Sequence, residues 1–316
     1  MNTRADSPEH HRKRSAPVPD AALLAELQPG QSVALLQELH ILTREGKLNQ
    51  DSRRKLKQVY HLYHFIEKIL LELVENAPTQ QPDVVAGATA GSAQISVADH
   101  GAGKSYLGFI LYDLFFRTRP NGWIYGVENR EELVQKSRDL ALRLGFTRMS
   151  FLHLQASDAA DSDKMPARID LVTALHACDT ATDDAIAFGL RKNARFMVLV
   201  PCCQAEVARA LNADKALNLK RTPLAELWRH PLHTREIGSQ LTNVLRCLHL
   251  EASGYQVTVT ELVGWEHSLK NELIIARYTG QYKPSAALRL QALLDQFGLQ
   301  ELQRTRFKLR VPVQRP

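Results

Sequence analysis

VADHGAGKS, residues 97–105, is the stretch of this chain that decides its fold. An apolar strand ends there in the acidic residue Asp99, and a Gly-x-Gly turn made by Gly101 and Gly103 then opens a helix. Glycine lets a backbone bend sharply and approach a ligand closely. The segment therefore predicts a ligand site at the end of the first strand of an α/β sheet.

Two ligands that such a turn can hold fit this sequence poorly. A triphosphate loop needs a glycine five positions before Gly103, where Ala98 stands, and the Asp99 carboxylate would repel the phosphates, although Gly-Lys-Ser is typical of its end. A dinucleotide turn that starts at Gly101 needs a third glycine or alanine at position 106, where the bulky Tyr106 stands. Both sites are the weaker interpretations.

The turn D-x-G-x-G of S-adenosylmethionine sites fits without strain, because it holds no pyrophosphate. We expect Asp99, Gly101 and Gly103 to bind this cofactor. Glu128 ends the second predicted strand, where a carboxylate accepts hydrogen bonds from ribose hydroxyls, although an acid there also fits NAD. Asp158 follows the third predicted strand, and it either accepts from the adenine amino group or is a loop or helix-cap carboxylate.

Strands and helices alternate around and after this turn. The predicted strands cover 94–99, 122–128, 149–155, 169–175, 196–201, 255–262 and 272–278. The predicted helices cover 101–116, 130–144, 183–192, 234–252 and 285–297. Strands that alternate with helices of this length predict an α/β fold with a parallel sheet and helices on both of its faces.

A strongly amphipathic helix is predicted over residues 51–76, before the sheet begins, with Asp51 or Ser52 as its cap. Its first turns carry four basic side chains: Arg53, Arg54, Lys55 and Lys57. These charges are either a solvated face of the helix or a surface that contacts phosphates of a bound substrate. The sequence leaves both interpretations open.

The remaining N-terminal segments have their own compositions. Residues 1–20 form a basic arm, 21–40 read as two short helices split by a Pro-Gly pair, and 77–93 read as a linker. The net charge of +6 and the pI of about 9.1 favour a polyanionic partner, which we expect to be RNA. The first residues lack the apolar segment of a secretory signal, and no apolar run is long enough for a membrane span. The four cysteines are too few and too badly spaced for a disulfide framework, which fits a reducing cytoplasm.

Polar residues follow the fourth and fifth predicted strands directly. His176 and Asp179 come after one strand, and Cys202 and Cys203 come after the next. The ends of neighbouring parallel strands meet at one edge, so these side chains are expected to share a pocket. Adjacent cysteines lack the spacer of a structural zinc site, which leaves buried packing or a cysteine nucleophile paired with His176 as further interpretations. We expect no metal.

Five segments together resemble a known family: ADHGAGKSYL, GVENR, LHACDTATDDAI, VPCCQ and EHSLKNELI. They are similar to S-adenosylmethionine-dependent methyltransferases, in particular methyltransferase-domain proteins related to the tRNA acceptor-stem 2′-O-methyltransferases. The resemblance covers roughly residues 94–278, and RRKLKQV at 53–59 also looks like the helical lead-in of bacterial members. It implies a Rossmann-like methyltransferase sheet, mostly parallel with an antiparallel last strand. The chain lacks the N-terminal zinc modules of the tRNA enzymes, so the particular RNA stays open.

The resemblance also sets the expected organisation and roles. The predicted divisions are a basic arm (1–20), a helical region for RNA recognition (21–85), the methyltransferase domain (86–282) and a C-terminal helix and tail (283–316). Asp179, His176 and Lys270 are the candidate bases for an acceptor hydroxyl. His176 is also expected near the cofactor, and Cys203 and Asn271 near the substrate. Methylation of a small molecule or a protein, and cofactor or RNA binding without catalysis, are the alternatives.

Overall fold

The computed structural model describes residues 26–76, 94–155, 157–175, 177, 179–201, 205–212, 223–262 and 272–309, with only the backbone at 228. Its centre is one sheet with the strand order β3-β2-β1-β4-β5-β7-β6. The strands are β1 (Ile95–His100), β2 (Gly122–Glu128), β3 (Met149–His153), β4 (Leu171–Leu175), β5 (Phe196–Val200), β6 (Tyr255–Glu261) and β7 (Glu272–Tyr278).

The pairing of these strands confirms the predicted fold class. β1 to β5 pair in parallel, whereas β7 runs antiparallel to both of its neighbours, β5 and β6. The sheet is therefore a mostly parallel, Rossmann-like methyltransferase sheet with an antiparallel last strand. The first strand lies in the middle, so the strand order reverses beside it and the loops after β1 and β4 diverge there. We call the edge where β1, β2, β4 and β5 end the carboxyl edge.

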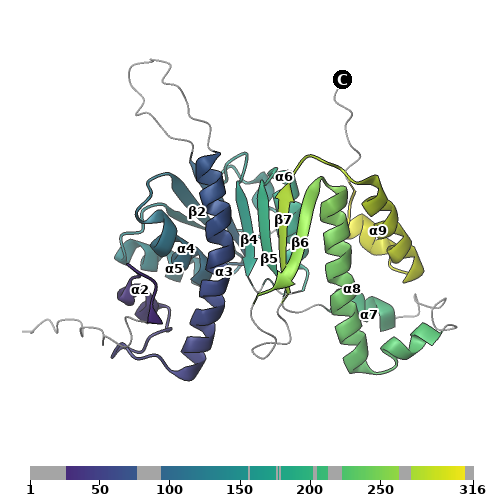
Figure 1. Cartoon of the computed structure of the whole chain (residues 1–316), viewed down its shortest axis with the longest axis horizontal. Coiled ribbons are helices and arrows are strands. Elements are labelled where there is room, and N and C mark those ends of the chain that lie inside the picture. Colours follow the sequence, from purple (N-terminus) through teal and green to yellow (C-terminus); the bar gives the residue numbers. More distant parts are fainter. Residues whose placement is uncertain are drawn as a thin grey trace, which may run out of the picture.

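Helices cover both faces of the sheet (Figure 1). They are α2 (Val33–Glu38), α3 (Gln50–Glu75), α4 (Tyr106–Leu111), α5 (Glu131–Arg143), α6 (Ala181–Arg191), α7 (Glu206–Asn212), α8 (Pro231–Ala252), α9 (Pro284–Gln296) and α10 (Gln300–Thr305). One hydrophobic cluster packs α2, α3, α4 and α5 against one face of the sheet. A second cluster packs α6 against the other face. A third cluster holds α7, α8, α9 and α10 together beside β6.

The long helix α3 lies across one face of the sheet and extends beyond it (Figure 1). Its later residues, among them Ile66 and Leu70, are fully buried in the cluster on that face. Glu72 also accepts a hydrogen bond from Arg277 of β7, with Nη2 and Oε1 2.5 Å apart. The helix has 26 residues and is thus about 39 Å long, roughly twice the length of a six-residue strand. Its N-terminal half therefore stands beside the carboxyl edge.

Several predicted boundaries differ from the structure. The cap of α3 is Asn49, whose Oδ1 accepts from the Ser52 N–H at 2.8 Å, and neither Asp51 nor Ser52. The helix predicted from residue 101 begins at Tyr106 and ends in a π-turn over 112–116. The sequence did not reveal α7 or α10, and of the two helices predicted in 21–40 only α2 lies wholly in described residues. The predicted segments 1–20 and 77–93 lie outside them.

Candidate cofactor and acceptor site

The turn after β1 depends on its glycines. Gly101 and Gly103 have φ angles of 62° and 58°, a left-handed conformation that costs a residue with a Cβ about 1–2 kcal/mol. A Cβ placed on Gly101 would lie 3.6 Å from the Cβ of Ala177, which follows β4. The Ala102 N–H donates to the Val127 carbonyl at 3.1 Å, which ties the turn to β2. The turn is thus fixed against two strand ends, with Gly101 exposed.

Asp99 lies buried beneath this turn. One of its carboxylate oxygens, Oδ1, accepts a hydrogen bond from the Thr173 hydroxyl of β4 at 2.9 Å. Burial raises the pKa of Asp99 to about 6, although the hydrogen bond from Thr173 acts to lower it. The carboxylate therefore joins β1 to β4 under the turn.

Glu128, at the end of β2, contacts the same turn. Its Oε2 accepts from the Gly103 N–H at 2.7 Å, and its Oε1 accepts from the Arg130 backbone N–H at 3.1 Å and from Arg130 Nε at 2.8 Å. Burial acts to raise the pKa of Glu128, but the hydrogen bonds from Arg130 and Gly103 outweigh it and hold the pKa below its usual value. The Arg130 side chain is 60% exposed, so its contact with Glu128 is at the surface.

His100 is a feature that sequence reasoning missed. Its imidazole is 1% exposed, lies 4.2 Å from the Phe188 ring centroid, and neither ring nitrogen has a hydrogen-bond partner among the residues that the structure describes. Burial lowers the pKa of His100 to about 3, so the ring is neutral at pH 7. The only available signal was a polar residue at a strand position where the pattern requires burial.

Asp158 lies after β3, which pairs with β2 in the sheet. Its side chain is exposed, and its Oδ1 accepts from the Ser157 hydroxyl at 2.8 Å. It occupies the cap position of a single 3₁₀ turn (Ala159–Asp161) but makes no side-chain cap hydrogen bond. Its role toward adenine stays a prediction.

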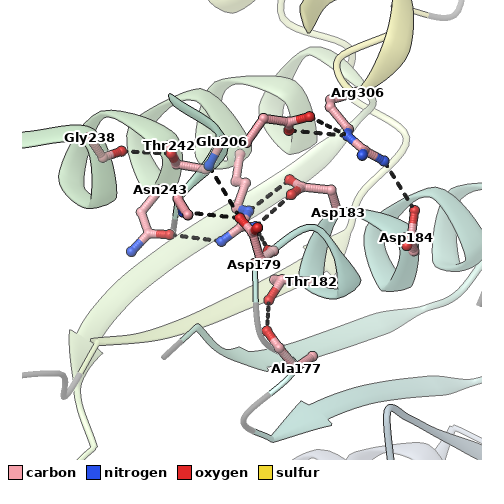
Figure 2. Close-up of polar contacts among 12 residues, drawn as sticks. Ala177, Asp179, Thr182, Asp183, Asp184, Glu206, Gly238, Thr242, Asn243 and Arg306 are labelled. Carbon is pink, nitrogen blue, oxygen red and sulfur yellow. Dashed lines mark hydrogen bonds and ion pairs between the residues drawn. The ribbon is translucent and has the colours of Figure 1, made fainter. Parts of the chain in front are cut away.

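Asp179 lies after β4 and binds the start of α7 (Figure 2). Its Oδ1 accepts from the backbone N–H groups of Ala205 and Glu206 at 3.0 and 3.3 Å, and its Oδ2 is 3.3 Å from Arg209 Nη2. Burial acts to raise the pKa of Asp179, but these backbone N–H groups and Arg209 lower it overall. A carboxylate held in this way is a weak base, and its contacts are those of a helix cap.

A buried arginine of α8, which the sequence did not reveal, holds the same loop, and its partners Asp179, Asp183 and Asn243 are labelled in Figure 2. Arg246 is 0% exposed and forms a two-pronged ion pair with Asp183 of α6, at 2.8 and 2.6 Å. It also donates to the Asp179 carbonyl at 3.0 Å and to the Asn243 side chain at 3.1 Å. Asn243 in turn donates to Glu272 at the start of β7, at 2.7 Å. The cluster therefore links the loop after β4 to the segment that begins β7.

The four basic residues of α3 do not form one surface. Arg53 pairs with Glu26 at 2.9 Å and lines, with Lys57, a cavity of about 730 Å³. Arg54 lies 3.7 Å from Asp51. Lys55 instead lines a second cavity of about 200 Å³ on the other flank of the helix, together with Tyr106 of α4 and Leu175 of β4.

The remaining predicted residues lie outside the described part of the chain. These are His176, Cys202, Cys203, Lys270 and Asn271. Within the described residues, no group of three His, Cys, Asp or Glu side chains is arranged to hold a metal ion. No helix in that part of the chain has the length and apolar character needed to span a membrane.

Comparison with known sequences decides the family. Residues 54–210 match the model of a family described as a methyltransferase domain. The chain carries a methyltransferase domain. The match confirms the predicted methyltransferase and, with it, S-adenosylmethionine as the methyl donor. The match begins within α3, so most of this helix lies in the matched region.

More distant likenesses were also found. A glutathione S-transferase C-terminal domain-containing protein of Xenopus laevis is 24% identical over 197 residues, which cover 57% of this chain and 30% of that protein. The solved magnesium protoporphyrin IX methyltransferase of Synechocystis PCC 6803 has a TM-score of 0.42 and 12% identity, over 79% of this chain and 96% of that one. TrmK of M. capricolum has a TM-score of 0.37 and 9% identity, over 70% and 73%. The family assignment rests on the domain match, and the fold on the strand order.

Proposed function

We propose that this chain transfers a methyl group from S-adenosylmethionine to RNA. The observation that carries the proposal is the arrangement of Glu128 and the glycine turn, in which a buried carboxylate lies beside an exposed left-handed backbone. A turn of this kind admits a ligand closely, and the adjacent carboxylate accepts hydrogen bonds from the two hydroxyls of a ribose.

The residues present fit the cofactor. Gly101 has the left-handed φ of 62° that favours glycine, and the exposed Arg130 is the group that a ribose would displace from Glu128. We assign Gly101, Gly103 and Glu128 to cofactor binding, with Asp158 toward the adenine. When bound, S-adenosylmethionine supplies a methyl group activated by its sulfonium. Asp99 is a positioning residue, because its carboxylate is committed to Thr173 under the turn.

The protein's own part in methyl transfer is alignment and proton removal. Displacement at the methyl group requires the acceptor atom to lie in line with it and away from water. Asp179, with its contacts to the start of α7, is proposed to shape the acceptor loop and not to take the proton. His176 and Lys270 remain the proposed bases, with His176 also near the cofactor and Cys203 and Asn271 near the substrate.

The choice of RNA rests on charge and placement. The chain has a net charge of +6, and the exposed Lys55 stands on the half of α3 that extends past the carboxyl edge. A cation there would contact a phosphate of a nucleic acid whose acceptor nucleotide lies at the edge.

Two measurements test the proposal. Calorimetry with S-adenosylhomocysteine should show binding, and ATP and NAD should show none. Labelled S-adenosylmethionine should then transfer its methyl group to the RNA fraction of a cell extract and not to its protein or metabolite fractions. RNA affinity should also fall steeply with salt. Label in protein or metabolites alone would give those acceptors instead, and cofactor binding without any label would indicate a binding protein.

A further inference from the structure

The cavity on the flank of α3 beside the sheet, which we call the α3 pocket, is placed for an acceptor. It has a volume of about 200 Å³ and is lined by Lys55, Gln58, Val59 and Leu62 of α3 together with Tyr106 and Leu175. Tyr106 begins α4 directly after the glycine turn, and Leu175 ends β4. The pocket therefore adjoins the turn proposed to hold the methyl donor.

The walls of the α3 pocket are mostly apolar, and its polar groups are free. Val59, Leu62 and Leu175 supply aliphatic surface, and Tyr106 supplies an aromatic ring. Within the part of the chain that the structure describes, the Gln58 amide, the Lys55 ammonium and the Tyr106 hydroxyl make no hydrogen bond or ion pair. A pocket with apolar walls and a few uncommitted polar groups is typical of small planar ligands.

The volume of the α3 pocket and the charges that line it limit which ligands it can hold. At roughly 30 Å³ for each water, the pocket has room for about seven waters, a space comparable to the rings of one nucleobase. An aromatic side chain stacks on a base, an amide both donates to and accepts from a base edge, and a lysine contacts phosphate. The cavity on the opposite flank is less suitable, because the carboxylates of Glu26 and Glu261 line it and Arg53 is already paired with Glu26.

We propose that the α3 pocket takes a single unpaired nucleobase of the RNA acceptor, stacked on Tyr106 and read at its edge by Gln58. This inference rests on the proposed function and deepens it, since it makes the substrate a single-stranded or flipped nucleotide and not a continuous duplex. Lys55 would contact the phosphate next to that base. The helix α3 is then part of the acceptor site as well as part of the core.

The test uses the full chain and two fluorescent oligonucleotides, each ten nucleotides long. One is a single strand of mixed bases, and the other has the same backbone with abasic sites throughout. The wild type should bind the first more tightly than the second. Tyr106→Ala should weaken binding of the first about 5–100-fold, as expected for loss of one stacked base, and should leave binding of the abasic strand unchanged. Tyr106→Phe keeps the ring and should bind like the wild type.

Two further variants guard against misfolding. Gln58→Ala, on a half-buried helix position, should weaken only the base-dependent part of binding, by about 3–10-fold. His61→Ala, on the opposite flank of α3, should change nothing. S-adenosylhomocysteine affinity should stay at the wild-type value in all four variants, and the melting temperature should do so in all but Tyr106→Ala, whose half-buried ring packs against the core.

The outcomes separate the two proposals. If RNA is methylated but Tyr106→Ala and Gln58→Ala bind and methylate it like the wild type, the α3 pocket is not the acceptor site and the proposed function stands. If the wild type binds the mixed-base and abasic strands equally, the nucleobase assignment is overturned. If the wild type binds no cofactor or labels no RNA, the proposed function itself fails, whatever the oligonucleotides show.

Discussion

The two sides of the carboxyl edge are built differently. On the side proposed for the cofactor, Glu128 contacts Arg130, two residues later, and Gly103 of the glycine turn, and the Arg130 side chain is exposed. On the acceptor side, Arg246 reaches Asp183 from a helix far along the chain, and the ion pair is completely enclosed. In the first arrangement a buried carboxylate is covered by the exposed side chain of Arg130, whereas the second commits both of its charges to the fold.

The difference indicates which substitutions should change ligand affinity and which should change stability. A carboxylate covered only by an exposed side chain is proposed to contribute to binding once a ligand displaces that side chain, while a buried ion pair that loses one partner leaves a desolvated charge behind. Substitutions on the cofactor side should therefore change cofactor affinity with little effect on melting. Substitutions on the acceptor side should do the reverse. A variant that changed both properties equally would break the comparison.

The largest expected effect is on the acceptor side. Arg246→Met should lower the free energy of unfolding by about 3–5 kcal/mol, because Asp183 is left buried and unpaired. A thermal melt should show a fall of roughly 10 °C. Calorimetry at a temperature where the variant is folded should still show wild-type affinity for S-adenosylhomocysteine. Replacement of both charges, Arg246→Met with Asp183→Leu, should regain part of the loss.

A surface ion pair supplies the matched control for this change. Arg289 lies 3.2 Å from Glu251, but its side chain is 61% exposed. Arg289→Met should therefore cost less than about 1 kcal/mol. If the two methionine variants melted at the same temperature, the buried ion pair would contribute no more to stability than the exposed one. A loss of cofactor affinity in Arg246→Met without a change in melting would invert the comparison.

The second effect is on the cofactor side. Glu128→Gln removes the charge that the proposal assigns to the ribose hydroxyls, so the affinity for S-adenosylhomocysteine should fall about 10–100-fold. The melting temperature should change little, because the amide oxygen can still accept from the Gly103 N–H. Glu132→Gln, an exposed carboxylate in the first turn of α5, is the control and should leave the affinity unchanged. Wild-type affinity in Glu128→Gln would remove the ribose assignment.

The same contrast explains what the sequence could predict. The glycine turn and Glu128 were predicted because strand ends and glycines mark their positions locally. Arg246 lies in an amphipathic helix that contains other polar residues. No residue near it in the sequence indicates that Asp183 is its partner. The late start of α4 was missed because Ser105 adopts a left-handed φ of 51°, which no local signal indicates for a residue with a side chain.

A third effect concerns pH and the buried His100. Its folded pKa of about 3 lies below the ordinary value of 6.5, so the unfolded chain takes up a proton first as the pH falls. Stability is therefore lost from about pH 6.5 downward. His100→Leu removes this loss, and its melting temperature relative to the wild type should rise between pH 8 and pH 5, by the equivalent of about 2 kcal/mol. A constant difference across that range would show that the pKa of His100 is not lowered in the folded protein.

Asp99, the neighbour of His100 in β1, changes the stability in the opposite direction. Its folded pKa of about 6 lies above the ordinary 3.8, so the folded chain holds a proton that the unfolded chain has lost between these values. Its contribution to stability is therefore lost as the pH rises toward 6. In the wild type the two neighbouring residues offset each other between about pH 4 and pH 6. The His100→Leu comparison isolates one of them, since Asp99 is present in both proteins.

The smallest expected effect tests whether Arg130 competes with the cofactor for the Glu128 carboxylate. Arg130 occupies both oxygens of Glu128 from the surface, at 2.8 Å and 3.3 Å, and a ribose would have to displace it. Exposed ion pairs contribute less than about 1 kcal/mol, so Arg130→Ala should tighten S-adenosylhomocysteine binding by no more than about fivefold. The gain should shrink with added salt, which weakens the pair in the wild type. Weaker binding in Arg130→Ala would instead indicate that the guanidinium contacts the bound cofactor. Both Arg130 and Glu128 would then contribute to cofactor binding.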